Sequence, residues 1–135
     1  MSKGDSGLYK YTAGANAAMV KELIATGEKC NPSDILGIFK CPNGRIVWLE
    51  KGCAEPRESG LVHILNAHGE QFKQKGILKA EIPHYIMEAV RQGNIVGYQG
   101  KRNPRTIFEF IYCGKKQRVA VQIASNGYIV SANPK

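Results

Sequence analysis

The sequence that decides the fold is Gly60-Leu-Val-His-Ile-Leu-Asn-Ala-His-Gly-Glu-Gln-Phe72, which holds two of the chain's three histidines. Ser59, directly before it, is a residue type that often caps the N-terminus of a helix. Apolar residues recur within it at helical spacing: Leu61, Ile64, Leu65 and Phe72. The pattern predicts an amphipathic helix with one face packed on a sheet.

Both histidines of this helix are candidates for chemistry. His68 falls on the apolar face, whereas His63 lies roughly 100° or more of helix rotation from the centre of that face. A histidine aimed at a sheet is either a core residue with satisfied hydrogen bonds or a titratable group that lines a cleft. Two histidines five residues apart, in a strongly basic chain, favour the cleft.

Length and charge restrict the class of protein. A chain of 135 residues suits one domain with a real hydrophobic core. Nineteen Lys and Arg against eleven Asp and Glu leave a net charge of +8. That balance favours an anionic partner: nucleic acid first, then a membrane surface or an acidic protein. We expect no membrane-spanning segment and no signal peptide, because no apolar run has the required length or flanks.

The first part of the chain predicts a helix followed by a β-hairpin. Good helix formers fill residues 14–26, and strand patterns at 35–40 and 45–50 flank Asn43-Gly44, a strong hairpin signal. The hairpin would bring Cys30 and Cys53 together, either as a disulfide or as two thiols. Cys113 is expected on an inner strand. No two cysteines are spaced Cys-x-x-Cys, so a zinc site is not expected.

The second part predicts another helix and then a sheet. Pro83 opens the helix, Gly93 closes it, and His84 in its first turn is expected at the surface or in a capping role. From there the pattern has period two, with strand candidates at residues 95–100, 106–113, 118–125 and 128–132 and a turn at 114–116. Such short connections predict an antiparallel meander. We therefore expect an α+β fold, with helices packed on one face of a twisted sheet of four or more strands.

Basic and aromatic side chains accumulate near the expected turns. The candidates for RNA binding are Lys101, Arg102, Tyr98, Lys115, Lys116 and Tyr128. Charges of this kind also serve as solvated edges that prevent sheet-to-sheet pairing. An aromatic ring beside a basic edge is, however, what an unstacked RNA base packs on.

Metal-free cleavage of RNA is the reaction that these residues suit. The chain has neither of the glycine-rich nucleotide-binding motifs and no cluster of carboxylates. Cleavage by the ribose 2′-hydroxyl requires a base, an acid and a cation that stabilises the phosphorane. His68 or His63, with Arg105 or Lys101 and a hydroxyl from the last strand, would be sufficient.

Three segments resemble the barnase, EndoU, colicin and RelE-like (BECR) ribonuclease superfamily. They are Gly60-Leu-Val-His-Ile-Leu-Asn-Ala-His68, the second helix ending in Gly93, and the closing strands with Asn126-Gly-Tyr-Ile-Val-Ser-Ala-Asn-Pro134. The chain looks most like the toxin tips of contact-dependent inhibition proteins (CdiA C-terminal domains) and related phage-encoded members. The resemblance covers about residues 55–135.

The resemblance implies a small toxin that cleaves RNA, often tRNA in the anticodon loop, without metal or other cofactor. The positions that match its catalytic groups are His63, His68, Arg105 and Ser131. Residues 56–135 would be the ribonuclease core, and residues 1–55 would serve uptake or face an immunity protein, all within a single compact domain.

The resemblance also implies how the toxin is delivered, where it acts and what neutralises it. The toxin would be exported as part of a larger effector, act in the cytoplasm of a target cell, be a monomer when unbound, and be neutralised by an immunity protein, acidic by charge complementarity. Two other interpretations of the residues stay open: a non-catalytic, basic RNA-binding module, and a small structural domain without chemistry.

Overall fold

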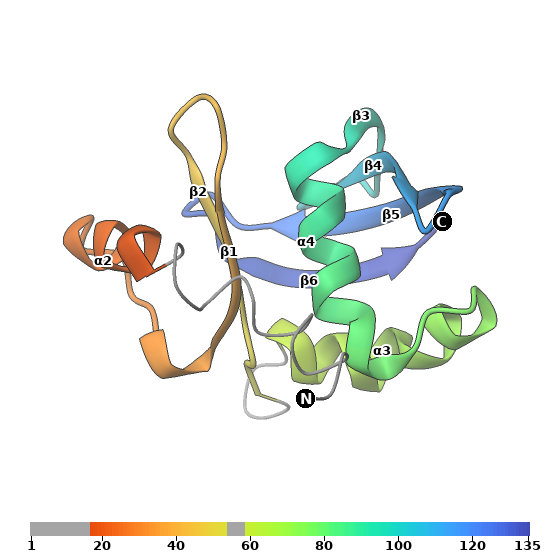
Figure 1. Cartoon of the computed structure of the whole chain (residues 1–135), viewed down its shortest axis with the longest axis horizontal. Coiled ribbons are helices and arrows are strands. Elements are labelled where there is room, and N and C mark those ends of the chain that lie inside the picture. The colour runs from red at the N-terminus through yellow and green to blue at the C-terminus, as the bar shows by residue number, and fades with distance from the viewer. Residues whose placement is uncertain (1–16, 54–58) are drawn as a thin grey trace.

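Two helices pack against a four-stranded sheet, with a hairpin and a short helix to one side (Figure 1). The computed structural model describes residues 17–53 and 59–135. The helices are α2 (Ala17–Ala25), α3 (Gly60–Gln74) and α4 (Ile82–Gln92), with 3-10 turns η2 (Pro32–Asp34) and η3 (Lys79–Glu81). The strands are β1 (Ile35–Lys40), β2 (Ile46–Glu50), β3 (Asn94–Gln99), β4 (Arg105–Tyr112), β5 (Lys115–Ile123) and β6 (Ile129–Pro134).

The main sheet is an antiparallel meander in the order β3-β4-β5-β6. The expected α+β class, with helices packed on an antiparallel sheet, is thereby confirmed. The expected turn at 114–116 is wrong by a residue or two, because Tyr112 pairs with Lys115. The turn is Cys113-Gly114, both with positive φ (50° and 79°), as a tight two-residue hairpin turn requires. Lys115 and Lys116 therefore belong to β5.

The core lies between the sheet and helices α3 and α4. In α4, Pro83 occupies the first turn, and the apolar stripe that includes Ile86 and Ala89 is buried. The ring of Tyr85 meets Phe72 of α3 at 5.7 Å and Phe110 of β4 at 5.0 Å, both edge to face. These contacts tie both helices to the sheet and so set where α3 presents its histidines.

The hairpin β1–β2 is attached to the end of the sheet at which β6 begins. The Trp48 N–H donates to the Gly127 carbonyl at 3.0 Å, and Trp48 bridges to Tyr128 in parallel. Alternate residues of β2 serve two cores: Val47 and Leu49 join the main core, whereas Trp48 packs with Leu23 of α2 in a smaller one. Of the helix predicted at 14–26, the part before Ala17 lies outside the described residues.

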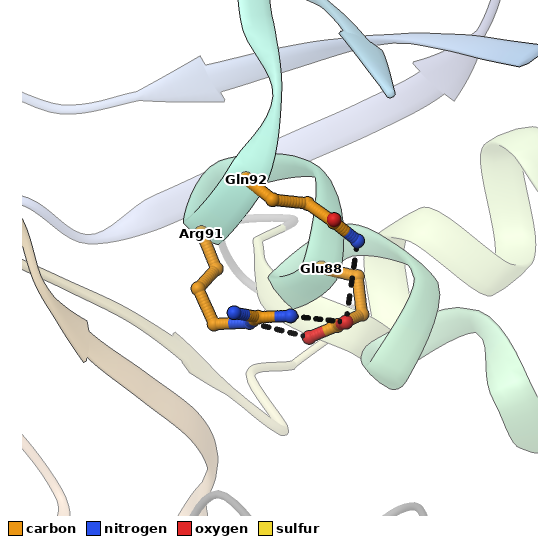
Figure 2. Close-up of polar contacts among 3 residues, drawn as sticks. All are labelled: Glu88, Arg91 and Gln92. Atoms are coloured by element: carbon orange, nitrogen blue, oxygen red, sulfur yellow. Dashed lines mark hydrogen bonds and ion pairs between the residues drawn. The ribbon is translucent and has the colours of Figure 1, made fainter. Parts of the chain in front are cut away.

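A polar network at the end of α4 joins three neighbouring side chains (Figure 2). Arg91 donates from Nε and Nη2 to the two oxygens of Glu88, at 2.8 and 2.7 Å. Gln92 Nε2 adds a bond of 3.3 Å to the same carboxylate. The charge of Arg91 is thus offset locally by Glu88, three residues before it.

The cysteines differ from the expectation in one respect. None of the four, all of which are described, forms a disulfide. Cys113 was expected on an inner strand but is exposed in the β4–β5 turn, because the two-residue turn includes its position. Among the described helices, none has the length and apolar composition needed to cross a membrane.

Candidate functional site

Helix α3 holds the two histidines side by side. The rings of His63 and His68 lie 5.9 Å apart between centroids and meet edge to face at 88°. His68 Nδ1 lies 3.0 Å from Gln71 Oε1. When Nδ1–H donates to this oxygen, Nε2 of the neutral ring carries the lone pair and is available as a base.

The surroundings of His68 favour its neutral form. Burial is the largest influence, and it lowers the pKa of His68 below the ordinary value of 6.5. The hydrogen bond to the Gln71 oxygen raises this pKa, whereas the positive charges of Arg105 and His63 lower it further. His68 is therefore within electrostatic reach of Arg105, a residue at the start of β4.

Arg105 is anchored across the sheet by an asparagine. Its Nη1 donates to Asn133 Oδ1 at 2.8 Å, and Asn133 Nδ2 donates in turn to Gln99 Oε1 at 3.4 Å. The chain of contacts joins β4, β6 and β3, and Asn133 is only 8% exposed. Burial lowers the pKa of Arg105, yet a guanidinium stays charged in proteins, so the site contains a fixed, half-buried cation.

Ser131 lies on the same side of β6 as Asn133, because the two residues are two positions apart in a strand. The side chain is almost fully buried, at 1% exposure, and its Oγ has no hydrogen-bond partner among the described residues. Such a buried hydroxyl costs about 1–3 kcal/mol. An unsatisfied polar atom of this kind calls for an explanation, and a ligand contact is one.

Helix α3 packs along the edge strand β6 (Figure 1), which brings the helix histidines to the strand that carries Ser131 and Asn133. Of the four predicted catalytic residues, the structure places His63 against His68, and the charge of Arg105 acts on His68. Ser131 lies on β6, the strand against which α3 packs. Asn133 and Gln99 were missed by the sequence analysis, although strand alternation from Ser131 points to Asn133.

The predicted RNA-binding residues do not form one surface. Lys101 and Arg102 lie in the β3–β4 turn, a few residues before Arg105. Lys115 and Lys116 of β5 pair with the opposite end of β4. That end lies roughly 24 Å from Arg105, at about 3.4 Å per strand residue. Only the first pair is at the end of the sheet where Arg105 begins its strand.

Neither of the two predicted tyrosines lies beside Arg105. Tyr98 is 66% exposed but neighbours Gln99 in β3, so it points to the opposite side of the sheet from the Gln99 side chain. Tyr128 lies at the N-terminal end of α3, where its Oη is 3.0 Å from Ser59 Oγ. Ser59 does occupy the N-cap position of α3, but without a capping side-chain bond to the helix.

His84 is separate from the pair on α3. It lies in the first turn of α4, half-buried, with its ring 6.2 Å from that of Tyr112. The expectation for His84 was a surface or capping position, and the aromatic ring of β4 covers one side of the imidazole.

Within residues 17–53 and 59–135, no three side chains of the His, Cys, Asp and Glu types come together as a metal-binding group would. No model of a known protein family matches the sequence, and no curated protein matches it as a relative.

Proposed function

We propose that this protein is an endoribonuclease toxin that cleaves RNA, in particular tRNA, by attack of the ribose 2′-hydroxyl without a metal ion. The observation that carries the proposal is the grouping of His63, His68 and Arg105. It combines two imidazole rings that contact each other with a third group, a half-buried guanidinium. The charge of this guanidinium acts on one of the two rings. These are the three kinds of group that the reaction requires.

Each group has a role that follows from its surroundings. His68, held neutral, takes the proton from the 2′-hydroxyl through Nε2. His63, whose ring lies 5.9 Å from that of His68, protonates the departing 5′-oxygen. Arg105 stabilises the phosphorane charge, and the Ser131 hydroxyl donates to a phosphate oxygen.

The proposal extends to the partners that the resemblance implies. The net charge of +8 attracts RNA and equally an acidic immunity protein that would block the site. Export within a larger effector, and action in the cytoplasm of the target cell, belong to the same proposal.

The first prediction tests the central histidine. His68→Ala should lower the rate of tRNA cleavage by about a hundredfold or more, the usual contribution of a general acid or base. His63→Ala should be second in severity. The assay is run with excess EDTA present throughout, and wild-type cleavage should be unaffected by the chelator.

The matched control is His84→Ala, which removes a histidine of another helix. It should keep its activity per folded molecule, even if the lost contact with Tyr112 lowers the melting temperature. Thermal unfolding measured on the same preparations separates lost chemistry from lost folding. A destabilised but active His68→Ala protein would contradict the assignment, and wild-type protein that binds tRNA without cutting it would be the RNA-binding module instead.

A further inference from the structure

A cavity of about 410 Å³ lies at the N-terminal end of α3. Side chains from the segment before η2, from the end of β2 and from the residue before β6 line it: Lys29, Cys30, Asn31, Glu50 and Tyr128. Its position is fixed by Tyr128, whose hydroxyl contacts Ser59 directly before the helix.

The carboxylate of Glu50 is the notable group in this cavity. Glu50 is only 9% exposed, and both of its hydrogen bonds end on Oε2, from Trp48 Nε1 at 2.8 Å and from the Asn31 N–H at 3.1 Å. Among the described residues, none donates to Oε1. A carboxylate oxygen accepts more than one hydrogen bond, so Oε1, on the wall of the cavity, can accept from a ligand. The cavity is therefore suited to a ligand that brings N–H groups to Oε1.

The other lining residues restrict what that ligand is. Tyr128 contributes an aromatic ring, and bases stack well on such rings. Burial, and then the charge of Glu50, raise the pKa of the Cys30 thiol, so this wall stays neutral. Lys29 adds a positive charge that suits a phosphate. An acceptor, a ring and a cation together match a nucleotide whose base carries an amino group.

We propose that this cavity binds one base of the RNA and selects cytosine, adenine or guanine over uracil through Glu50. The proposal rests on the proposed function, because it supplies the base-recognition part of the same RNA site. A carboxylate accepts from an exocyclic amino group. Uracil instead presents two carbonyl oxygens on either side of its single N–H, and these repel the carboxylate.

The distance to the histidines suits this arrangement. Ser59, which contacts Tyr128, precedes His63 by four residues. At 1.5 Å per residue this is a rise of about 6 Å along the helix. A nucleotide whose base occupies the cavity would thus direct its backbone toward the first of the two rings.

The experiment compares the binding of cytidine and uridine monophosphates, which differ only in the base, to the wild-type protein by calorimetry. Cytidine monophosphate should bind at least about tenfold more tightly, because a site built around one hydrogen bond rejects the ligand that lacks it. Amide resonances of Asn31 and Tyr128 should shift on titration. Equal affinities, or shifts confined to other parts of the protein, would overturn the proposal.

Glu50→Gln tests the carboxylate itself and should reduce the preference for cytidine to below about twofold. Glu28→Gln, an exposed neighbour, is the matched control and should keep the full preference. An unchanged preference in Glu50→Gln would overturn the proposal. Since the wild-type comparison needs no variant, a poorly folded Glu50→Gln leaves the test intact. The monophosphates contain no phosphodiester bond for a ribonuclease to cleave, so a failure of the ribonuclease proposal is distinguished from a failure of this one.

Discussion

At the scale of the residue, the surroundings of His68 favour its neutral form. Burial and the nearby positive charges of Arg105 and His63 lower the pKa of His68. A histidine with a depressed pKa is neutral at pH 7 and suits a base. It is also a group whose protonation disfavours the folded state, so its contribution to stability is present above pH 6.5 and lost as the pH falls.

The second prediction concerns the pH dependence of cleavage. Because the base must be neutral, kcat should fall as the pH drops through the pKa of His68, below the ordinary 6.5. Arg105→Gln removes one of the charges that lower this pKa, so the acidic limb of the profile should move to higher pH, in addition to a lower maximal rate. The profile of kcat between pH 4.5 and 8, the range on either side of that ordinary value, measures both effects. An acidic limb that stays in place in Arg105→Gln would show that the two residues do not interact.

The third prediction assigns Asn133 a positioning role. Asn133→Asp would place a carboxylate against Arg105 and neutralise the cation, whereas Asn133→Ala would release it. We expect both variants to lower kcat by about tenfold or more, with little change in KM for tRNA. Gln99→Ala is the matched control, since the 3.4 Å bond to Gln99 is the longer one. A loss confined to thermal stability would reduce Asn133 to a structural residue.

At the scale of elements, the junction between β2 and the turn before β6 holds the hairpin to the sheet. Gly127 has φ of +101°, and its carbonyl accepts a hydrogen bond from the Trp48 N–H. A Cβ at this position would lie 1.9 Å from the Ile46 carbonyl oxygen. Only glycine therefore allows the two backbones to approach so closely.

The fourth prediction compares two glycines with positive φ. Gly127→Ala should lower the free energy of unfolding by more than about 4 kcal/mol, in the range reserved for severe disruption, because the backbone of β2 must move. Gly114→Ala is the matched control: its φ is +79°, but a Cβ there meets nothing within 4 Å. Its loss should be about 1–2 kcal/mol, from the left-handed backbone alone. Denaturant titration measures both, and equal losses would contradict the close approach.

For the whole molecule, the net charge of +8 bears on how RNA approaches the site. Ion pairs among the described residues include Arg91 with Glu88 and Arg118 with Glu109, both at 2.7 Å. Lys101 and Arg102 are exposed in the turn before Arg105. RNA should therefore approach the site mainly from the β3–β4 end of the sheet.

The fifth prediction concerns salt. The affinity for tRNA should fall at least about tenfold between 50 and 200 mM salt, because bound phosphates release counterions. Lys101→Ala should reduce the slope of log affinity against log salt concentration by nearly one. Lys116→Ala, at the far end of β4, should change this slope little. Fluorescence anisotropy at four salt concentrations measures the slopes. A flat affinity in the wild-type protein would remove nucleic acid as the partner.

The sequence by itself determined the elements of this protein. Pro83 and Gly93 mark the two ends of the second helix, and Asn43-Gly44 marks the hairpin turn. Period-two strands with short connections dictate an antiparallel meander. These features depend on local backbone preferences and on the spacing of apolar residues, both of which are readable along the chain. The pairing of His63 with His68 belongs here too, because one helix carries both.

Only the tertiary structure decided which distant residues meet. Asn133 reaches Arg105 across β5, and Glu50 shares a cavity with Tyr128, contacts that no local pattern encodes. Likewise, the basic residues that cluster along the sequence near turns are split between the two ends of β4. The physical reason is that strand register and the docking of a hairpin follow from the packing of the whole core, and a shift of one residue in register reverses the side to which every side chain of a strand points.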